Sequence, residues 1–226
     1  MVSRIKKIIA RGKIKNPNKP GIILLKNRFV EIAVEKYHSL LMSVKKDSTF
    51  TDVDTLFMCS LFPQRVLDLV IKELRPKSVL DVGCGVGNSL KYYLDSNIDA
   101  LGIENSSIAI SRSPVKEKII KHNLKKILNL NKEFDLVWYF EVIEHIHPDY
   151  ENNFLKTLTN HSNNILISAA RPGQGGHGHF NEKEPGYWIN KFGKLGYQFD
   201  ENFTLKVRST MDNHSENLLF FTKNNL

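Results

Sequence analysis

The chain has 226 residues, of which 41% are hydrophobic and 25% are charged, and it contains two cysteines. These values are ordinary for a globular protein, and the length allows one α/β domain with a full core and a small extension. Two widely separated cysteines argue against a disulfide scaffold and favour a reducing compartment, so we expect a cytoplasmic protein. The sequence also predicts neither a secretory signal nor a transmembrane segment.

The net charge is +8, which attracts polyanions and makes RNA a candidate partner. Much of the excess lies in residues 4–28, however, where a solvated lysine-rich arm accounts for it equally well. We expect residues 1–49 to form a basic, helical N-terminal extension and residues 50–226 to form the functional domain. The sequence indicates no oligomeric state.

Two helices are predicted before the first strand. Residues 22–45 carry apolar side chains at helical spacing, and a second helix, broken near Pro63, runs to Leu74. We expect this extension to cover a ligand with the apolar side chains Phe50, Phe57 and Phe62.

Strands and helices then alternate along the chain. The predicted strands are 78–82, 100–104, 118–122, 134–140 and 164–169, and the predicted helices are 88–94, 150–159 and 186–195. Residues 199–207 and 217–223 are predicted to close the sheet as an antiparallel pair, because a short polar segment joins them. This pattern predicts a doubly wound, seven-stranded, mostly parallel sheet, whose ligands bind beyond the carboxyl ends of the strands.

The most informative stretch follows the first predicted strand. Asp81 ends that strand, and Gly83, Gly85 and Gly87 then alternate with other residues up to a helix start. Glycines allow a sharp turn and let a ligand lie against the backbone. The spacing differs from the G-x-G-x-x-G dinucleotide pattern, and an acid this close to a pyrophosphate would repel it. A ligand without phosphates is therefore expected, unless the glycines serve backbone geometry alone.

Glu104 ends the second predicted strand, about twenty residues after the glycine turn, as in nucleoside-binding proteins. Two carboxylate oxygens match two vicinal ribose hydroxyls. The alternative is a surface acid at a strand end.

Together, these residues resemble motif I and the strand-two acid of class I S-adenosylmethionine-dependent methyltransferases, in particular the ubiquinone-pathway O-methyltransferase and methyltransferase type 11–23 group. The resemblance covers about residues 50–223. It implies the fold just described, the activity, and S-adenosylmethionine as cofactor. Asn123 stands where the family often has aspartate, and an amide can still bind an adenine edge. The cofactor-binding residues so implied are Asp81, Gly83, Cys84, Gly85, Gly87, Glu104, Asn105, Asn123, Leu124 and Glu141.

A second group of polar residues follows the fourth predicted strand. If residues 141–146 turn helically, Glu141, Glu144 and His145 share one face. The glycine-rich loop after the fifth strand adds His177 and His179, from the same edge of the sheet. Two carboxylates together with one or two imidazoles could hold Mg²⁺ or another divalent metal.

The Glu-x-x-Glu-His segment resembles two methyltransferase groups, the metal-dependent RNA 2′-O-methyltransferases and the ubiquinone-pathway enzymes. It also occurs in relatives with no known metal. The proposed metal ligands are Glu141, Glu144, His145 and His179, and the candidate bases are His145, His179 and His177. Arg171, Asn181 and Trp188 are expected to line the acceptor pocket.

We therefore expect methyl transfer to a hydroxyl or amine of a small polar molecule. RNA as the acceptor is the first alternative, and a non-catalytic cofactor-binding interaction module is an alternative of another class.

Overall fold

The structure is a computed structural model that describes residues 62–176 and 178–224. Its helices and strands are α4 (Gln64–Leu74), β1 (Ser78–Val82), α5 (Asn88–Asp95), β2 (Asp99–Glu104), α6 (Ser107–Arg112), β3 (Ile119–Lys121), β4 (Leu136–Phe140), α7 (Glu151–Thr159), β5 (Asn164–Ser168), α8 (Pro185–Lys194), β6 (Tyr197–Phe199), α9 (Glu201–Arg208) and β7 (Leu218–Lys223). Short 3₁₀ turns occupy Lys116–Lys118, Ile143–His145, Pro148–Tyr150 and Ser215–Asn217.

The predictions for the N-terminal extension, including the 22–45 helix, the boundary at residue 49 and the cover by Phe50 and Phe57, lie outside the described residues. Phe62 is described, and its ring meets the Tyr92 ring edge-on at 5.4 Å. Among the described helices, none is both long and apolar enough to cross a bilayer.

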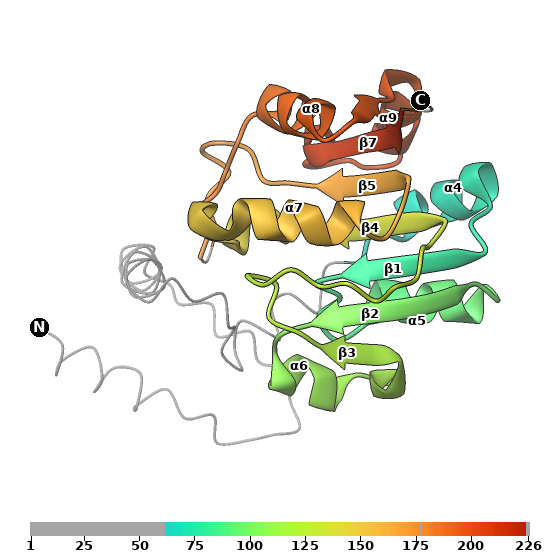
Figure 1. Cartoon of the computed structure of the whole chain (residues 1–226). Coiled ribbons are helices and arrows are strands. Elements are labelled where there is room, and N and C mark those ends of the chain that lie inside the picture. The colour runs from blue at the N-terminus through green and yellow to red at the C-terminus, as the bar shows by residue number, and fades with distance from the viewer. Residues whose placement is uncertain (1–61, 177, 225–226) are drawn as a thin grey trace, which may run out of the picture. The chain divides into compact units, whose positions relative to one another are not determined.

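The strands form a seven-stranded sheet in the order β3-β2-β1-β4-β5-β7-β6 (Figure 1). Strands β1 to β5 are parallel, and β7 runs antiparallel to both β5 and β6. The central strands are short apolar runs whose residues are buried on both faces, as parallel sheets require. The predicted fold class is thus confirmed.

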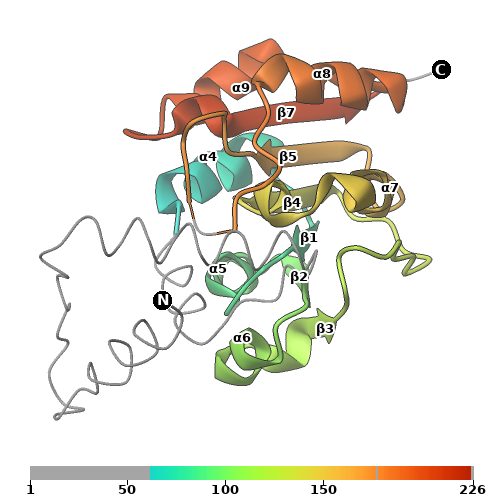
Figure 2. The ribbon, with the colours of Figure 1, turned by 90° about the vertical axis from the view of Figure 1, so that its left-hand side faces the viewer.

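Helices cover both faces of the sheet. Helices α4, α5 and α9 pack on one face through residues such as Leu67, Tyr93 and Val207. Helices α7 and α8 pack on the other through Phe154 and Trp188. Figure 2 shows α5 and α7 on opposite sides of the sheet.

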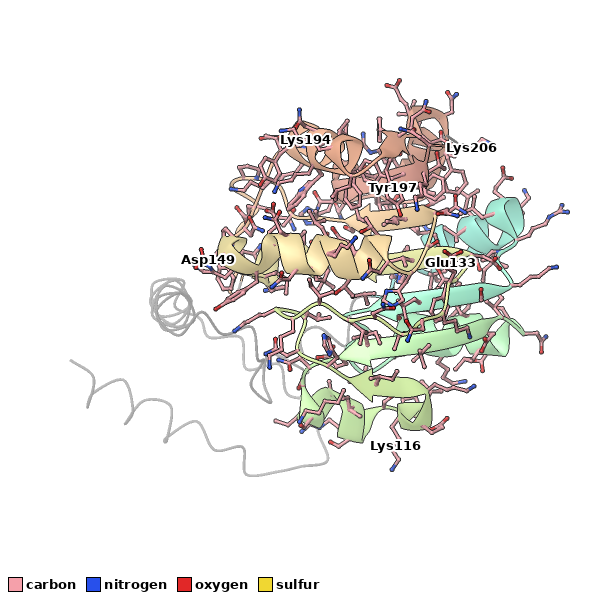
Figure 3. All side chains as sticks on the ribbon, in the orientation of Figure 1. Lys116, Glu133, Asp149, Lys194, Tyr197 and Lys206 are labelled. Carbon is pink, nitrogen blue, oxygen red and sulfur yellow. The ribbon has the colours of Figure 1, made fainter. Side chains whose placement is uncertain are left out.

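Because strands β1 to β5 are parallel, all of their carboxyl ends lie on one side of the sheet, called the carboxyl edge below, and their amino ends lie on the opposite side. Figure 3 labels Asp149, at the carboxyl edge where α7 begins, and Glu133, at the opposite edge before β4. The loops after β1, β2, β4 and β5 therefore meet at the carboxyl edge, where ligands bind in open α/β sheets.

Two elements differ from the sequence expectation. Residues 199–207 were predicted as a strand, but only Tyr197–Phe199 pairs with β7, and Glu201–Arg208 forms helix α9. Asp200 explains the difference, because its side chain accepts a hydrogen bond from Phe203 N and caps the helix. Helix α6 was not predicted, although Ser106 caps it in the same way.

Candidate functional site

The glycine turn after β1 is held against the end of β2. Both Gly83 N and Cys84 N donate to Ile103 O, at 2.8 and 3.1 Å. Gly83 has φ +75°, and a Cβ there would come within 2.7 Å of Val142. The position therefore needs glycine both for its backbone conformation and for the close approach of the loop after β4.

Glu104, at the end of β2, is linked to the glycine turn. One carboxylate oxygen accepts from Gly85 N at 2.9 Å, and the other accepts from the backbone N–H groups of Asn105 and Ser106, each at 2.7 Å. Burial raises the pKa of Glu104, and these three donors act against that rise. The turn and the acid therefore form one unit, held by the Gly85–Glu104 hydrogen bond.

Asp81 lies beneath the turn and is 3% exposed. Burial, followed by the charge of Glu104, raises its pKa to about 8. Its Oδ2 atom has no hydrogen-bond partner among the described residues. Burial likewise raises the pKa of the Cys84 thiol well above its usual range, so this free cysteine is not a thiolate nucleophile.

The residues expected to hold the adenine follow β3. Leu124 is buried in the core, and Asn123 Oδ1 accepts from Lys125 N at 3.0 Å, which closes a local turn. His122 N donates to Glu104 O at 2.9 Å. This backbone contact brings the 122–126 turn beside the acid that was expected to bind ribose.

Glu141 does not join the other residues of the Glu-x-x-Glu-His segment on one helical face. Its φ is +53°, and the 3₁₀ turn begins only at Ile143. Its carboxylate accepts hydrogen bonds from the Ser168 hydroxyl, from Asn217 Nδ2 at 3.0 Å and from Gln174 Nε2 at 3.0 Å. Sequence reasoning missed these three partners: Ser168 ends β5, Gln174 lies in the β5–α8 loop, and Asn217 ends the 3₁₀ turn before β7.

Glu144, His145 and His179 do converge. Potential ligand atoms of the three side chains lie within 4.8 Å of one another, and the two imidazoles meet edge-to-face at 4.8 Å. The loop carrying His179 is fixed here because Phe180 N and Asn181 N both donate to Glu144 O. His177 lies outside the described residues.

Glu144 is the electrostatically unusual member of this cluster. Glu144 is fully buried, and neither carboxylate oxygen makes a well-formed hydrogen bond within the described residues, although the Ala170 backbone and the Glu141 carboxyl lie near enough to affect its pKa. Burial, followed by the charge of Glu141, raises its pKa well above the usual range. A buried carboxylate without well-formed hydrogen bonds costs free energy unless it stays protonated or meets a cation.

Of the residues expected to line the acceptor pocket, Arg171 is accessible, with a side chain 40% exposed between Glu184 and Glu216. Asn181 is 1% exposed and donates to Glu151 at 3.2 Å. Trp188 is also 1% exposed and packs in the core. Asn181 thus links the loop to α7, and Trp188 packs α8 onto the sheet; their role in the acceptor pocket stays a prediction.

A pocket of about 730 Å³ borders the same edge of the sheet. It lies between the first turn of α4 and the connection from α9 to β7. The last lining residue along the chain, His214, stands three residues before Asn217. Sequence reasoning did not predict this pocket. Its lining residues are Phe62, Pro63, Gln64, Arg65, Val66, Asp68, Thr210, Met211, Asp212, Asn213 and His214.

Comparisons with known proteins agree with this geometry. The family model Methyltransf_23, described as a methyltransferase domain, matches residues 57–214, which is more than half of the chain. A search of the curated proteins found no match.

Several solved structures share the fold. The magnesium protoporphyrin IX methyltransferase ChlM from Synechocystis PCC 6803, solved with bound SAH, is 13% identical, with a TM-score of 0.57 over 86% of this chain and 100% of that one. The plantazolicin methyltransferase BpumL is 17% identical, with a TM-score of 0.57 over 86% and 98%.

The small RNA methyltransferase HEN1 is also 17% identical, with a TM-score of 0.55 over 72% of this chain. The present chain spans only 25% of the length of HEN1. At these identities the likenesses show the fold alone.

Proposed function

This chain belongs to the Methyltransf_23 family of methyltransferase domains and is an S-adenosylmethionine-dependent methyltransferase, and we propose that it methylates a hydroxyl or amine of a small polar molecule. One observation carries the proposal. The Gly85–Glu104 unit and the Glu144–His145–His179 cluster follow β1, β2, β4 and β5 at the same carboxyl edge. A nucleoside-binding end and a proton-accepting end therefore share one side of the sheet.

We assign the cofactor to the first of these groups. Glu104 can accept hydrogen bonds from the ribose hydroxyls, since each carboxylate oxygen has more than one acceptor direction. Asn123 and Leu124 are assigned to the adenine, and Asp81 and the glycine turn to the methionine end. The backbone donors that already fix Glu104 mean that little side-chain entropy is lost when the ribose binds.

The transfer needs alignment and one proton acceptor. The acceptor oxygen or nitrogen attacks the sulfonium methyl carbon, a new C–O or C–N bond forms, and the C–S bond breaks. Its electron pair stays on sulfur, which leaves a neutral thioether. The acceptor proton passes to His145 or His179, which are the best-placed bases in the described chain.

A divalent metal is a finer proposal at the same place. Glu144, His145 and His179 fit such an ion, because three donors converge and the buried carboxylate of Glu144 makes no well-formed hydrogen bond to the described residues. Glu141 fits less well, because three side chains already hold its carboxylate. A bound ion would act as a Lewis acid toward the acceptor oxygen.

Metal binding can be measured without knowing the acceptor. We expect Mn²⁺ to bind the EDTA-treated protein in a calorimetric titration, and Glu144→Gln to weaken that binding at least about tenfold. Glu141→Gln should have a smaller effect. If Mn²⁺ does not bind the wild-type protein, the cluster has acid–base and packing roles only.

RNA remains the second candidate acceptor because cations lie over rings near this edge. Lys125 Nζ lies 5.6 Å from the Tyr150 ring, and Lys183 and Lys191 lie 5.5 and 5.8 Å from the Tyr187 ring. Aromatic rings with neighbouring lysines are typical of surfaces that bind single-stranded nucleic acid.

Labelled cofactor distinguishes the two acceptors. The protein is incubated with S-adenosylmethionine carrying a radioactive methyl group and with a cell extract, which is then separated into RNA and low-molecular-weight fractions. We expect the label in the low-molecular-weight fraction, with no effect of prior RNase treatment. Label that stays with RNA and disappears after RNase treatment would replace the small-molecule proposal with the RNA one.

A further inference from the structure

The carboxylate of Glu182 organises the loop between β5 and α8. It accepts hydrogen bonds from Gly173 N and Gly175 N, both at 2.9 Å, and lies 3.0 Å from His179 Nδ1. The side chain is only 17% exposed. Three contacts from one loop commit the two carboxylate oxygens to a single orientation.

Gly176 supports the same imidazole from a different direction. A Cβ at this residue would lie 2.5 Å from His179 Nε2, 2.7 Å from Cε1 and 2.8 Å from Cδ2. These three similar distances mean that the face of the ring lies against the Gly176 backbone. The φ of Gly176 is +154°. The position therefore favours glycine both because a Cβ would clash with the ring and because of its backbone conformation.

His145 completes the surroundings of the ring, with its own ring nearly perpendicular at 81°. The His179 imidazole is therefore bounded by a backbone on one face, a second imidazole, and a carboxylate on Nδ1. Such a ring cannot flip without breaking the Glu182 contact.

From these contacts we infer that Glu182 and Gly176 are positioning residues, which keep the proton of neutral His179 on Nδ1 and leave the lone pair of Nε2 for the reaction or for a metal. A carboxylate accepts but does not donate, so a neutral imidazole beside it must carry its proton on the nitrogen that faces it. The same arrangement orients histidines that bind metals or act as bases. The role of Nε2 rests on the proposed function, whereas the position of the proton does not.

The loop offers a matched control. Glu184 is two residues further along and 61% exposed, and its described contact is a longer one of 3.5 Å to Arg171. Glu184→Gln removes the same charge from the same segment without touching His179. Glu182→Gln places an amide donor where only an acceptor fits the three N–H groups.

The proton position can be read by NMR of ¹⁵N-histidine-labelled full-length protein. Spectra are recorded at increasing pH until the ¹⁵N shifts of His179 stop changing, so that the tautomer is read on the neutral ring. The His179 signal is assigned by its loss in His179→Gln. We expect the Nδ1–H tautomer in wild type and in Glu184→Gln, and a shift of at least about half of the population to Nε2–H in Glu182→Gln. Gly176→Ala should also change the His179 signal.

The wild-type spectrum alone can overturn the inference, even if Glu182→Gln fails to fold. An Nε2–H tautomer in wild type would contradict it, and so would an unchanged tautomer in a folded Glu182→Gln protein. Calorimetric titration with S-adenosylhomocysteine on the same samples keeps the two proposals apart. If S-adenosylhomocysteine does not bind the wild-type protein, the cofactor assignment is contradicted, and the tautomer result still stands.

Discussion

At the scale of single residues, the carboxyl edge holds acids in surroundings that disfavour their charge. Asp81 is the clearest case, because burial and Glu104 together raise its pKa to about 8 from an ordinary value of 3.8. In the fold without cofactor this acid therefore keeps its proton over a range of pH in which the unfolded chain has released it.

This difference predicts a pH-dependent gain of stability in Asp81→Asn. Well below pH 3.8 both states of the wild-type protein are protonated, and the variant should have its smallest stability advantage there. Between pH 3.8 and about 8 the wild-type fold loses stability as the pH rises, because the unfolded chain binds fewer protons. Asparagine has no such loss, so at about pH 9 the cofactor-free variant should be more stable by about 1–3 kcal/mol.

Urea unfolding followed by circular dichroism at several pH values checks this expectation. Asp95→Asn is a suitable control, since Asp95 lies on the surface of α5 and pairs with Lys91. A stability difference between wild type and Asp81→Asn that does not grow with pH would contradict the account of Asp81.

Residue type alone could not separate a ligand contact from a structural contact. Trp188 and Asn181 have the chemistry of a binding pocket, yet both are 1% exposed. Asn181, Tyr187 and Lys191 converge on the buried carboxylate of Glu151, at the start of α7. The structural role of Asn181 depends on Glu151, which lies thirty positions earlier in the chain. No local sequence pattern reveals such a contact.

At the scale of elements, helix α9 shows where a local pattern was ambiguous. Phe203, Leu205 and Val207 alternate with polar residues, which favours a strand. In the helix, Phe203, Thr204 and Val207 are buried and Leu205 is 55% exposed. The acid at Asp200, followed by an acid in the first turn, was the helix signal that outweighed the alternation.

The cap gives a prediction for this element. Asp200→Ala removes the hydrogen bond to Phe203 N, at 2.8 Å, and should lower the free energy of unfolding by about 1 kcal/mol. Glu201→Ala, one residue later, should cost less. Denaturant unfolding measures both variants, and equal stability of Asp200→Ala and wild type would show that the cap does not hold α9.

The loop after β4 shows the limit of helical spacing as a guide. Positions 141, 144 and 145 would share a face in a continuous helix, but the positive φ of Glu141 turns its carboxylate toward Ser168, Gln174 and Asn217. A non-glycine residue in this conformation carries strain of about 1–3 kcal/mol, which such sites offset by surrounding contacts.

At the scale of the whole molecule, alternation of strands and helices was enough to predict the doubly wound sheet and the edge that carries the site. The central strands β1, β4 and β5 are mostly apolar runs of ordinary length, and parallel connections place their carboxyl ends together. The glycine turn and Glu104 were predictable for the same reason, because both lie directly at strand ends. The partners of Glu141 and Glu151 were not, since they depend on packing between distant segments.

The central claim is that the Gly85–Glu104 unit holds the nucleoside of S-adenosylmethionine. Calorimetric titration of S-adenosylhomocysteine into wild type and Glu104→Gln tests it most directly, with Glu117→Gln, an exposed acid before β3, as the control. We expect one binding site in wild type and in the control, and a loss of about 1.5–3 kcal/mol in Glu104→Gln, or roughly ten- to a hundredfold in affinity. No binding to wild type, or equal affinity in Glu104→Gln, would contradict the claim.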